Sequence, residues 1–247
     1  MNKTLIINIS YLTTRKNRGS ELPAEYEEKY FYGVGSGYRR GYTWETVGYL
    51  LQSHFKDVTL HSRYKSGRWL DAGCAKGFLL KIANQHGWKP FGFDASPYAV
   101  EEARKVCPNA QIFVSDAQDP LPFSNNFFEV ITACELVEHL PEPNKFFKEA
   151  WRLLKHGGLL FITTPNASSI FSSNQAKNLC RVVKVDTPFH DETHVSYFTS
   201  ESIERLLKRC GFSRVETKHS LDFLWRWSVH LPSSIAWTMR AFAYRLR

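Results

Sequence analysis

The sequence is poor in cysteine and has no long apolar run. Its five cysteines are widely separated, their number is odd, and no two form a Cys-x-x-Cys pair. The sequence therefore indicates neither a disulfide framework nor a structural zinc site. It has no uncharged apolar stretch of roughly 18 residues, the length typical of a membrane span. The short apolar run near the N-terminus is interrupted by Asn8, which is untypical of a signal peptide. We therefore expect a cytoplasmic protein.

Internal repeats and low-complexity tracts are also lacking. At 247 residues, with 43% hydrophobic and 23% charged residues, the chain suits one globular α/β domain with additional segments. Its formal net charge of +8 is compatible with an anionic partner such as a phosphorylated glycan, a nucleic acid or an acidic membrane surface. The charge alone does not choose among these partners.

From Arg68 onward, short apolar runs alternate with amphipathic segments. This rhythm is typical of repeated β-α units and predicts a Rossmann-like, mostly parallel sheet flanked by helices. Predicted strands lie at 68–72, 89–94, 111–115, 128–133, 158–163 and 212–217, and predicted helices at 42–55, 77–86, 97–106, 143–155 and 200–210. We divide the chain into an N-terminal cap with its helix (1–55), a core (56–220, with an acceptor-side insertion at 165–198) and a C-terminal extension (221–247).

The most informative segment is Asp71-Ala72-Gly73-Cys74-Ala75-Lys76-Gly77, which follows a predicted buried strand and opens a predicted helix. Small residues let a ligand approach the backbone closely, and the N–H groups at a helix start favour an anionic group. Taken alone, the segment is also compatible with a tight turn that binds nothing.

Two further carboxylates follow the next two predicted strands. Asp94 stands about twenty residues after the loop, where a carboxylate can accept hydrogen bonds from both hydroxyls of a ribose. Asp116 follows the third strand, where a carboxylate can accept from the exocyclic amine of an adenine. Ligands of open parallel sheets bind outside the carboxyl ends of the strands. Asp71, Asp94 and Asp116 therefore predict a nucleoside-bearing ligand at this edge.

These motifs together resemble the class I S-adenosylmethionine (SAM)-dependent methyltransferase family. The resemblance runs from about Arg68 to Thr217 and includes Glu135-Leu136-Val137-Glu138-His139-Leu140 and a Leu-Lys-x-Gly-Gly turn at 154–158. It implies SAM as cofactor, with the glycine loop around its methionine part, Asp94 on the ribose, and Asp116 with the Ala117 backbone at the adenine. The cofactor-binding residues expected in this way are Asp71, Gly73, Cys74, Ala75, Gly77, Asp94, Ala95, Asp116, Ala117 and Glu135.

Three features depart from the family pattern. Ala75 stands where the middle glycine is usual, which we expect to be tolerated with a negative φ, and Glu129 replaces an aspartate at the start of the fourth strand. The family usually closes its sheet with an antiparallel seventh strand, whereas residues 221–247 do not alternate like one. We therefore expect a C-terminal helical extension in its place.

We expect methyl transfer to oxygen, or less readily nitrogen, of a small molecule or saccharide. A nicotinamide dehydrogenase would carry Gly-x-Gly-x-x-Gly, which this loop lacks. A nucleic-acid or protein methyltransferase and a non-catalytic SAM-binding domain remain alternatives. The basic residues are dispersed and no Asn-Pro-Pro-Tyr or Asp-Pro-Pro-Tyr motif follows the fourth strand, so we expect no nucleic-acid partner. The three aspartates argue against a domain that has lost its cofactor.

For a hydroxyl acceptor, a general base would promote loss of the proton, and His139 and His194 are the candidates for this role. His139 lies just past the fourth strand, where a loop-stabilising hydrogen bond is the alternative role. The segment beginning at His194 resembles one that borders the acceptor pocket in small-molecule O-methyltransferases of this family. His190 and His194 could also suggest metal ligands, but without a third ligand we expect no metal site.

Two aromatic segments flank the core. Residues 26–42 combine tyrosines with Arg39 and Arg40, which suits a sugar or phosphate-bearing acceptor or simple packing, and we expect this arm to form a lid over the cofactor. Residues 221–247 mix aromatic and basic side chains, which is typical of peripheral membrane contact or of a helix packed on the sheet or on a second subunit. The oligomeric state is left open.

Overall fold

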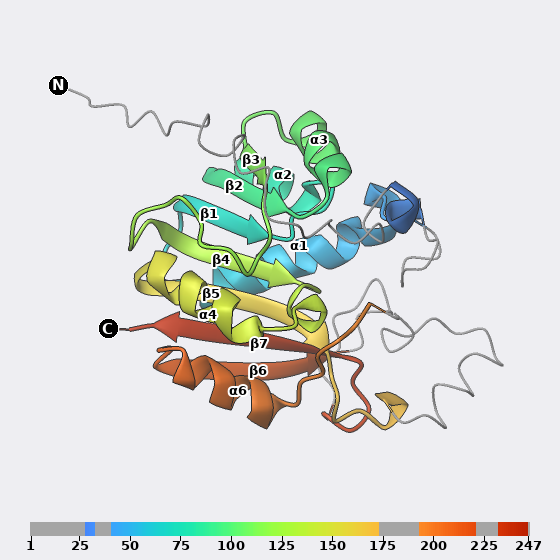
Figure 1. The fold of residues 1–247 in the computed structure, drawn as a ribbon, viewed down its shortest axis with the longest axis vertical. Helices are drawn as coiled ribbons and strands as arrows, with labels where there is room; N and C mark the ends of the chain where they lie inside the picture. Colours follow the sequence, from blue (N-terminus) through green and yellow to red (C-terminus); the bar gives the residue numbers. More distant parts are fainter. Residues whose placement is uncertain (1–27, 33–40, 173–192, 221–231, 247) are drawn as a thin grey trace.

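A seven-stranded sheet runs through the part of the chain that the computed structural model describes, residues 28–32, 41–172, 193–220 and 232–246. Its order is β3-β2-β1-β4-β5-β7-β6 (Figure 1). The strands are β1 (Gly67–Ala72), β2 (Trp88–Asp94), β3 (Gln111–Val114), β4 (Phe128–Cys134), β5 (Leu154–Pro165), β6 (Arg214–Ser220) and β7 (Thr238–Arg245). The first five are parallel, and β7 is antiparallel to both of its neighbours. The predicted Rossmann-like sheet is confirmed.

The central strands are buried on both faces, and successive residues point to opposite sides. On β4, Ile131 packs into the largest apolar cluster while its neighbour Val130 packs into a second cluster on the other face. Such strands consist of continuous apolar runs because helices cover both sides of the sheet. This is why the apolar runs of β1, β2, β4 and β5 could be recognised in the sequence.

Helices cover both faces of the sheet. They are α1 (Trp44–His61), α2 (Phe78–Gln85), α3 (Pro97–Val106), α4 (Pro143–Leu153) and α6 (Ser200–Arg209), with single 3-10 turns η3 (Glu28–Tyr32), η4 (Val137–His139) and η5 (Ile170–Ser172). Figure 1 shows α4 and α6 on one face and α1 on the other. Among the described residues, no helix combines the length and apolar composition needed to cross a bilayer.

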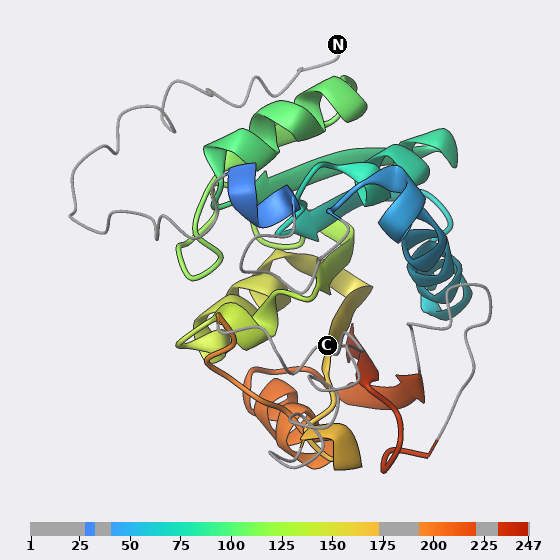
Figure 2. The ribbon, with the colours of Figure 1, turned by 90° about the vertical axis from the view of Figure 1, so that its right-hand side faces the viewer.

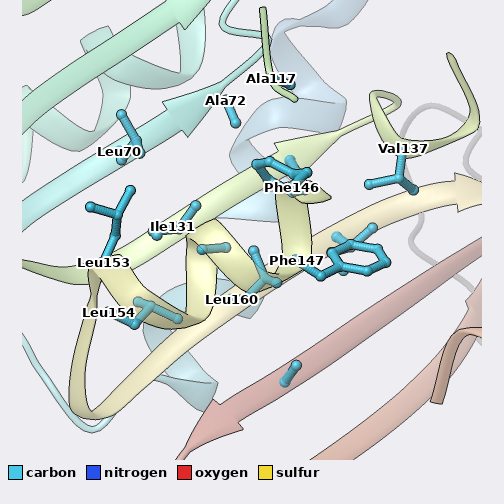
Figure 3. Close-up of a cluster of buried hydrophobic side chains, with 14 of the residues drawn as sticks. Leu70, Ala72, Ala117, Ile131, Val137, Phe146, Phe147, Leu153, Leu154 and Leu160 are labelled. Carbon is cyan, nitrogen blue, oxygen red and sulfur yellow. The ribbon is translucent and has the colours of Figure 1, made fainter. Parts of the chain in front are cut away.

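The face beneath α4 holds the largest apolar cluster. Phe146 and Phe147 of α4 lie over Ile131 of β4 and Leu160 of β5 (Figure 3). The helix predicted at 143–155 ends at Leu153 because the backbone turns into β5 at Leu154. This packing holds the carboxyl ends of β4 and β5 in fixed positions relative to each other.

The expectation of a C-terminal helical extension is wrong. Residues 238–245 form β7, which lies between β5 and β6. Met239, Ala241 and Ala243 face one apolar cluster and Phe242 faces the other, so both sides of the strand are covered. Alternation between polar and apolar residues is absent for that reason. The family's antiparallel seventh strand is present after all, and the core extends beyond residue 220 to Arg245.

The buried cation Arg240 joins β7 to α1. It is 1% exposed and forms an ion pair through Nη1 with Asp57 of α1, and it donates to Ser53 Oγ at 3.2 Å. The helix predicted at 42–55 extends to His61, so it includes Asp57. A division of the chain at residue 55 would cut this helix, so α1 belongs with the sheet that it covers.

Candidate active site

The loop after β1 reverses direction through three residues with positive φ. Gly73, Ala75 and Gly77 have φ of 67°, 46° and 74°. The loop contains the predicted turn, but Ala75 does not have the negative φ on which we based its tolerance, because this residue adopts the left-handed conformation that alanine disfavours. A Cβ on Gly77 would lie 2.9 Å from the Cβ of Ala103, so α2 and α3 require glycine there.

Replacing Ala75 with glycine is expected to stabilise the protein by roughly 0.5–1 kcal/mol. The left-handed conformation costs an L-residue about 1–2 kcal/mol, from which the greater flexibility of glycine in the unfolded chain subtracts about 0.5–1 kcal/mol. Chemical denaturation measures the change. Ala83→Gly, the same replacement inside α2, is the matched control and is expected to destabilise. A less stable Ala75→Gly protein would show that the loop is not strained.

Asp94, at the end of β2, organises the loop from the neighbouring strand. Its Oδ2 accepts from the backbone N–H of Ala75 at 2.9 Å, and its Oδ1 accepts from that of Ser96 at 2.9 Å. Burial raises the pKa of Asp94, while these backbone donors oppose the shift. A half-buried carboxylate therefore stands beside the turn, next to Ala95, as the sequence predicted.

Asp71, the last-but-one residue of β1, is 4% exposed. Thr132 of the adjacent β4 donates from Oγ1 to Asp71 Oδ1 at 2.6 Å, and Trp69 Nε1 donates to the same hydroxyl at 2.9 Å. Burial raises the pKa of Asp71 to about 7, against the hydrogen bond from Thr132, and the charge of Asp94 adds to the increase. The two aspartates are therefore close enough to interact, as expected from neighbouring strands.

The remaining loop and strand-three residues are placed as follows. Cys74 is buried among Leu80 and Val100, so its side chain belongs to the core between α2 and α3. Asp116 follows β3, and its Oδ1 accepts from the backbone N–H of Gln118 at 2.8 Å. Ala117 is 7% exposed and packs in the largest apolar cluster. Figure 2 looks onto the edge at which β1, β2 and β4 end.

A second polar group follows β4. Glu135 has a φ of 49°, and its backbone N–H donates to the carbonyl of Thr163 at 3.0 Å. Three residues on, Glu138 is completely buried, and burial followed by the charge of Glu135 raises its pKa well above the ordinary value. The ring centroids of His139 and His194 lie 4.7 Å apart. The structure thus brings together both predicted histidines, whereas His190 lies outside the described residues.

Tyr42, which precedes α1, belongs to the aromatic arm at 26–42, but the sequence did not single it out as a site residue. Its ring stacks on Phe78 with centroids 5.8 Å apart, and its backbone N–H donates to the carbonyl of Phe31 at 2.7 Å. Burial, and then the charge of Asp71, raise the pKa of Tyr42 well above its usual range. No periodicity distinguished this tyrosine from the others of the arm, so only the fold could place it beside the loop.

The sequence also did not indicate a role for Lys76, because it occupies a position of the loop where the motif allows any residue. It is 7% exposed, and its Nζ lies 4.5 Å from the ring centroid of Tyr32 and 5.9 Å from that of Tyr98. This cation connects the loop to η3, drawn in blue beside the strand ends in Figure 2.

Together, these elements fit SAM. Small residues leave the loop backbone accessible, and the carboxylates of Asp71, Asp94 and Asp116 suit an ammonium group, ribose hydroxyls and an adenine amine. A parallel sheet of this order, closed by an antiparallel strand, defines the fold class of SAM-dependent methyltransferases. A model of the methyltransferase domain family matches residues 44–217. The chain belongs to that family, and SAM is its methyl donor.

Comparisons with individual proteins agree with this assignment. The chain is 32% identical over 140 residues to a ubiquinone biosynthesis O-methyltransferase of Coxiella burnetii, a match that covers 50% of this chain and 56% of the relative. Against the protein of the same description from Xanthomonas oryzae pv. oryzae, identity is 31% over 103 residues, covering 40% and 43%. The chain therefore spans about half the length of these curated relatives.

Two solved structures share the fold. A SAM-dependent methyltransferase of Thermotoga maritima, described as a possible histamine N-methyltransferase, superposes with a TM-score of 0.60 at 16% identity, covering 81% of this chain and 91% of that one. Phosphoethanolamine N-methyltransferase 2 of Haemonchus contortus, solved in complex with SAM, gives a TM-score of 0.60 at 18% identity, covering 79% and 53%. At these identities the likeness shows the fold alone.

Proposed function

We propose that this protein transfers the methyl group of SAM to a hydroxyl oxygen of a small-molecule acceptor. The observation that carries the proposal is the arrangement of Asp71, Asp94 and Asp116 at the ends of three adjacent strands around a left-handed loop. The O-methyltransferase names of the curated relatives support oxygen as the acceptor atom. Nitrogen, and a saccharide as the acceptor molecule, remain alternatives within the same proposal.

When bound, SAM supplies a methyl group already activated by its sulfonium. The protein's own part is to bind, orient and exclude water. In the proposed complex, Asp71 accepts from the ammonium of the methionine part, Asp94 from the ribose and Asp116 from the adenine amine, with Ala95 and Ala117 beside the base. Glu135 follows β4 and is proposed to contact the cofactor from that strand end. His139 and His194 face the acceptor and promote loss of its hydroxyl proton.

Calorimetric titration of the intact chain with SAM and with its demethylated product tests the donor. We expect micromolar binding of both, and no binding would disprove the proposal. Incubation with methyl-labelled SAM and panels of hydroxylated small molecules, amines and saccharides then tests the acceptor. Mass spectrometry of the labelled product distinguishes oxygen from nitrogen.

SAM affinity is expected to rise with pH, about fivefold between pH 6 and 7. The ammonium of SAM requires ionised Asp71, whose pKa in the unliganded protein is about 7. The unliganded protein should lose stability over the same pH range. The pKa of Asp71 is higher in the folded than in the unfolded chain, so its contribution to stability is complete below about pH 4 and is lost as the pH rises through about 7. Calorimetry at each pH measures the affinity, and Asp71→Asn should abolish its pH dependence. If SAM affinity changed with pH equally in the two proteins, Asp71 would not be the partner of the SAM ammonium group.

We further propose that η3 is part of a lid over the cofactor. The support is the contact of Lys76 with Tyr32 and Phe31, whose ring centroid lies 5.8 Å from Nζ. Lys76→Met is expected to weaken SAM binding roughly 3- to 30-fold, the range of cation–π energies. Lys81→Met, an exposed lysine of α2, is the matched control. Equal affinities of the two variants, or unchanged affinity and turnover after deletion of residues 1–38, would disprove the lid.

We propose peripheral membrane contact for residues 221–231, which lie outside the described residues. The later part of the C-terminal segment is excluded from this proposal because β7 is buried in the sheet. The support is the composition around Trp225, Arg226 and Trp227. Liposome flotation of a Trp225→Ser/Trp227→Ser protein tests the contact without removing β7, and flotation equal to that of the unmodified chain would disprove it.

A further inference from the structure

Three potential metal ligands meet beyond the end of β4. One side-chain atom each from Glu138, His139 and His194 lies within 4.8 Å of the other two. Glu138 and His139 belong to η4, whereas His194 comes from a segment 55 residues further along the chain. The sequence pattern paired His194 with His190 and offered no third ligand, so we expected no metal, whereas the fold brings Glu138 and His139 to His194.

A bound cation would stabilise the ionised form of the buried carboxyl group of Glu138. Its side chain is 0% exposed, and neither carboxylate oxygen is in hydrogen-bonding geometry with another described residue, although Thr164 and Glu135 lie beside it. A buried carboxyl group is normally hydrogen-bonded or paired with a cation, since leaving it without a partner costs several kcal/mol. No lysine or arginine side chain within the described residues forms an ion pair with Glu138. A second carboxylate, Glu135, lies close enough to raise the negative potential further.

The backbone holds the two segments together. The carbonyl of Glu138 accepts from the N–H groups of Val195 and Ser196, both at 2.9 Å. Ser196 Oγ donates to the carbonyl of Leu140 at 3.0 Å. These bonds fix His194 opposite η4, so the three ligand side chains are positioned by main-chain contacts on both sides.

His139 is also oriented by an outer partner. Its Nδ1 lies 2.9 Å from Thr193 Oγ1 and 3.3 Å from the carbonyl of Thr193. When Nδ1 carries the proton and donates to these oxygens, the lone pair of the ring is at Nε2. This arrangement, with one ring nitrogen bonded to an outer oxygen, is typical of metal-ligating histidines.

We propose that Glu138, His139 and His194 bind a divalent first-row transition-metal ion. Two imidazole nitrogens and one carboxylate suit such ions and leave coordination positions open for other oxygens. Tetrahedral ligand atoms at about 2.1 Å from a metal lie about 3.4 Å apart, so side-chain atoms as far as 4.8 Å apart need to close by about 1.4 Å on binding.

The role of the ion rests on the proposed function, whereas its binding does not. A divalent cation beside the acceptor lowers the pKa of a coordinating hydroxyl. The hydroxyl proton then passes to water, the oxygen forms a bond to the methyl carbon, and the carbon–sulfur bond breaks with its electron pair kept by sulfur. The histidines would thus act as ligands and not as bases.

Titration of the metal-free, intact chain with Co²⁺ tests the site through visible absorption, a readout independent of activity. We expect one equivalent to bind with the bands of nitrogen and oxygen ligation, and Zn²⁺ to displace it. Glu138→Gln and His194→Asn should each abolish these bands. His156→Asn, which replaces an exposed histidine, is the matched control and should keep them.

Thermal unfolding and SAM calorimetry of each variant verify that it is folded. SAM binding with no Co²⁺ bands in the unmodified protein would overturn the metal site and leave the methyltransferase proposal intact. Unchanged bands in a folded His194→Asn protein, or thiolate charge-transfer bands, would place the ion elsewhere and also overturn it. Because either ligand variant can answer the question, misfolding of one does not prevent the test.

Discussion

Asp94→Ala is expected to weaken SAM binding by at least about 100-fold. In the proposed complex the carboxylate accepts both ribose hydroxyls, and it already accepts from the N–H groups of Ala75 in the loop and of Ser96 at the start of α3. Hydrogen bonds to a charged group contribute about 1.5–3 kcal/mol each, so the loss of two corresponds to a factor of about 100 or more. Calorimetric titration with SAM and its demethylated product measures the change.

The controls separate recognition from folding. Asp94→Asn keeps one acceptor oxygen, so its affinity should lie between those of the unmodified protein and Asp94→Ala. Glu101→Ala removes an exposed carboxylate of α3 and should bind as the unmodified protein does. If Asp94→Ala lost less than about threefold while remaining folded, Asp94 would not be the ribose ligand.

Asp57→Ala is expected to lower the free energy of unfolding by about 3 kcal/mol or more. The mutation removes the carboxylate that pairs with Arg240, which is 1% exposed. Removal of one partner from a buried ion pair costs about 3–5 kcal/mol, because the remaining charge stays in a medium that solvates it poorly. Denaturant unfolding followed by circular dichroism measures the loss.

A double replacement tests the cause. In Asp57→Leu/Arg240→Met both charges are replaced by apolar groups, so most of the lost stability should return. The exposed pair Glu102–Lys105 provides the comparison, since Glu102→Ala should cost no more than about 1 kcal/mol. If the double variant were no more stable than Asp57→Ala, the loss would come from packing and not from the unpaired charge.

The parallel half of the fold could be predicted because its signals are local. Buried strands appear as apolar runs, and the residues that end them stand next to turns of small residues. Asp71 and Asp94 therefore could be placed at one edge from spacing alone, and the structure brings them within electrostatic reach of each other.

The rest depends on contacts between distant residues. β7 does not look like a strand in the sequence, because its charged residue Arg240 is buried. Its partner Asp57 lies far away along the chain, so no local signal indicates the pairing. The positive φ of Ala75 is imposed by the loop's closure on Asp94, and the sequence does not display it. Glu138 and His194 meet only because main-chain bonds join two separate segments.

The position of β7 has a consequence for biosynthesis. Among the strands of the sheet it is the last to be made, yet it lies inside the sheet, between β5 and β6. Until the ribosome has released the chain through Arg245, β5 exposes an unpaired apolar edge and β6 has no neighbour to pair with. The nascent chain can assemble the parallel strands early, but it completes the sheet only after β7 has been translated. Between these two events, aggregation or chaperone binding competes with folding.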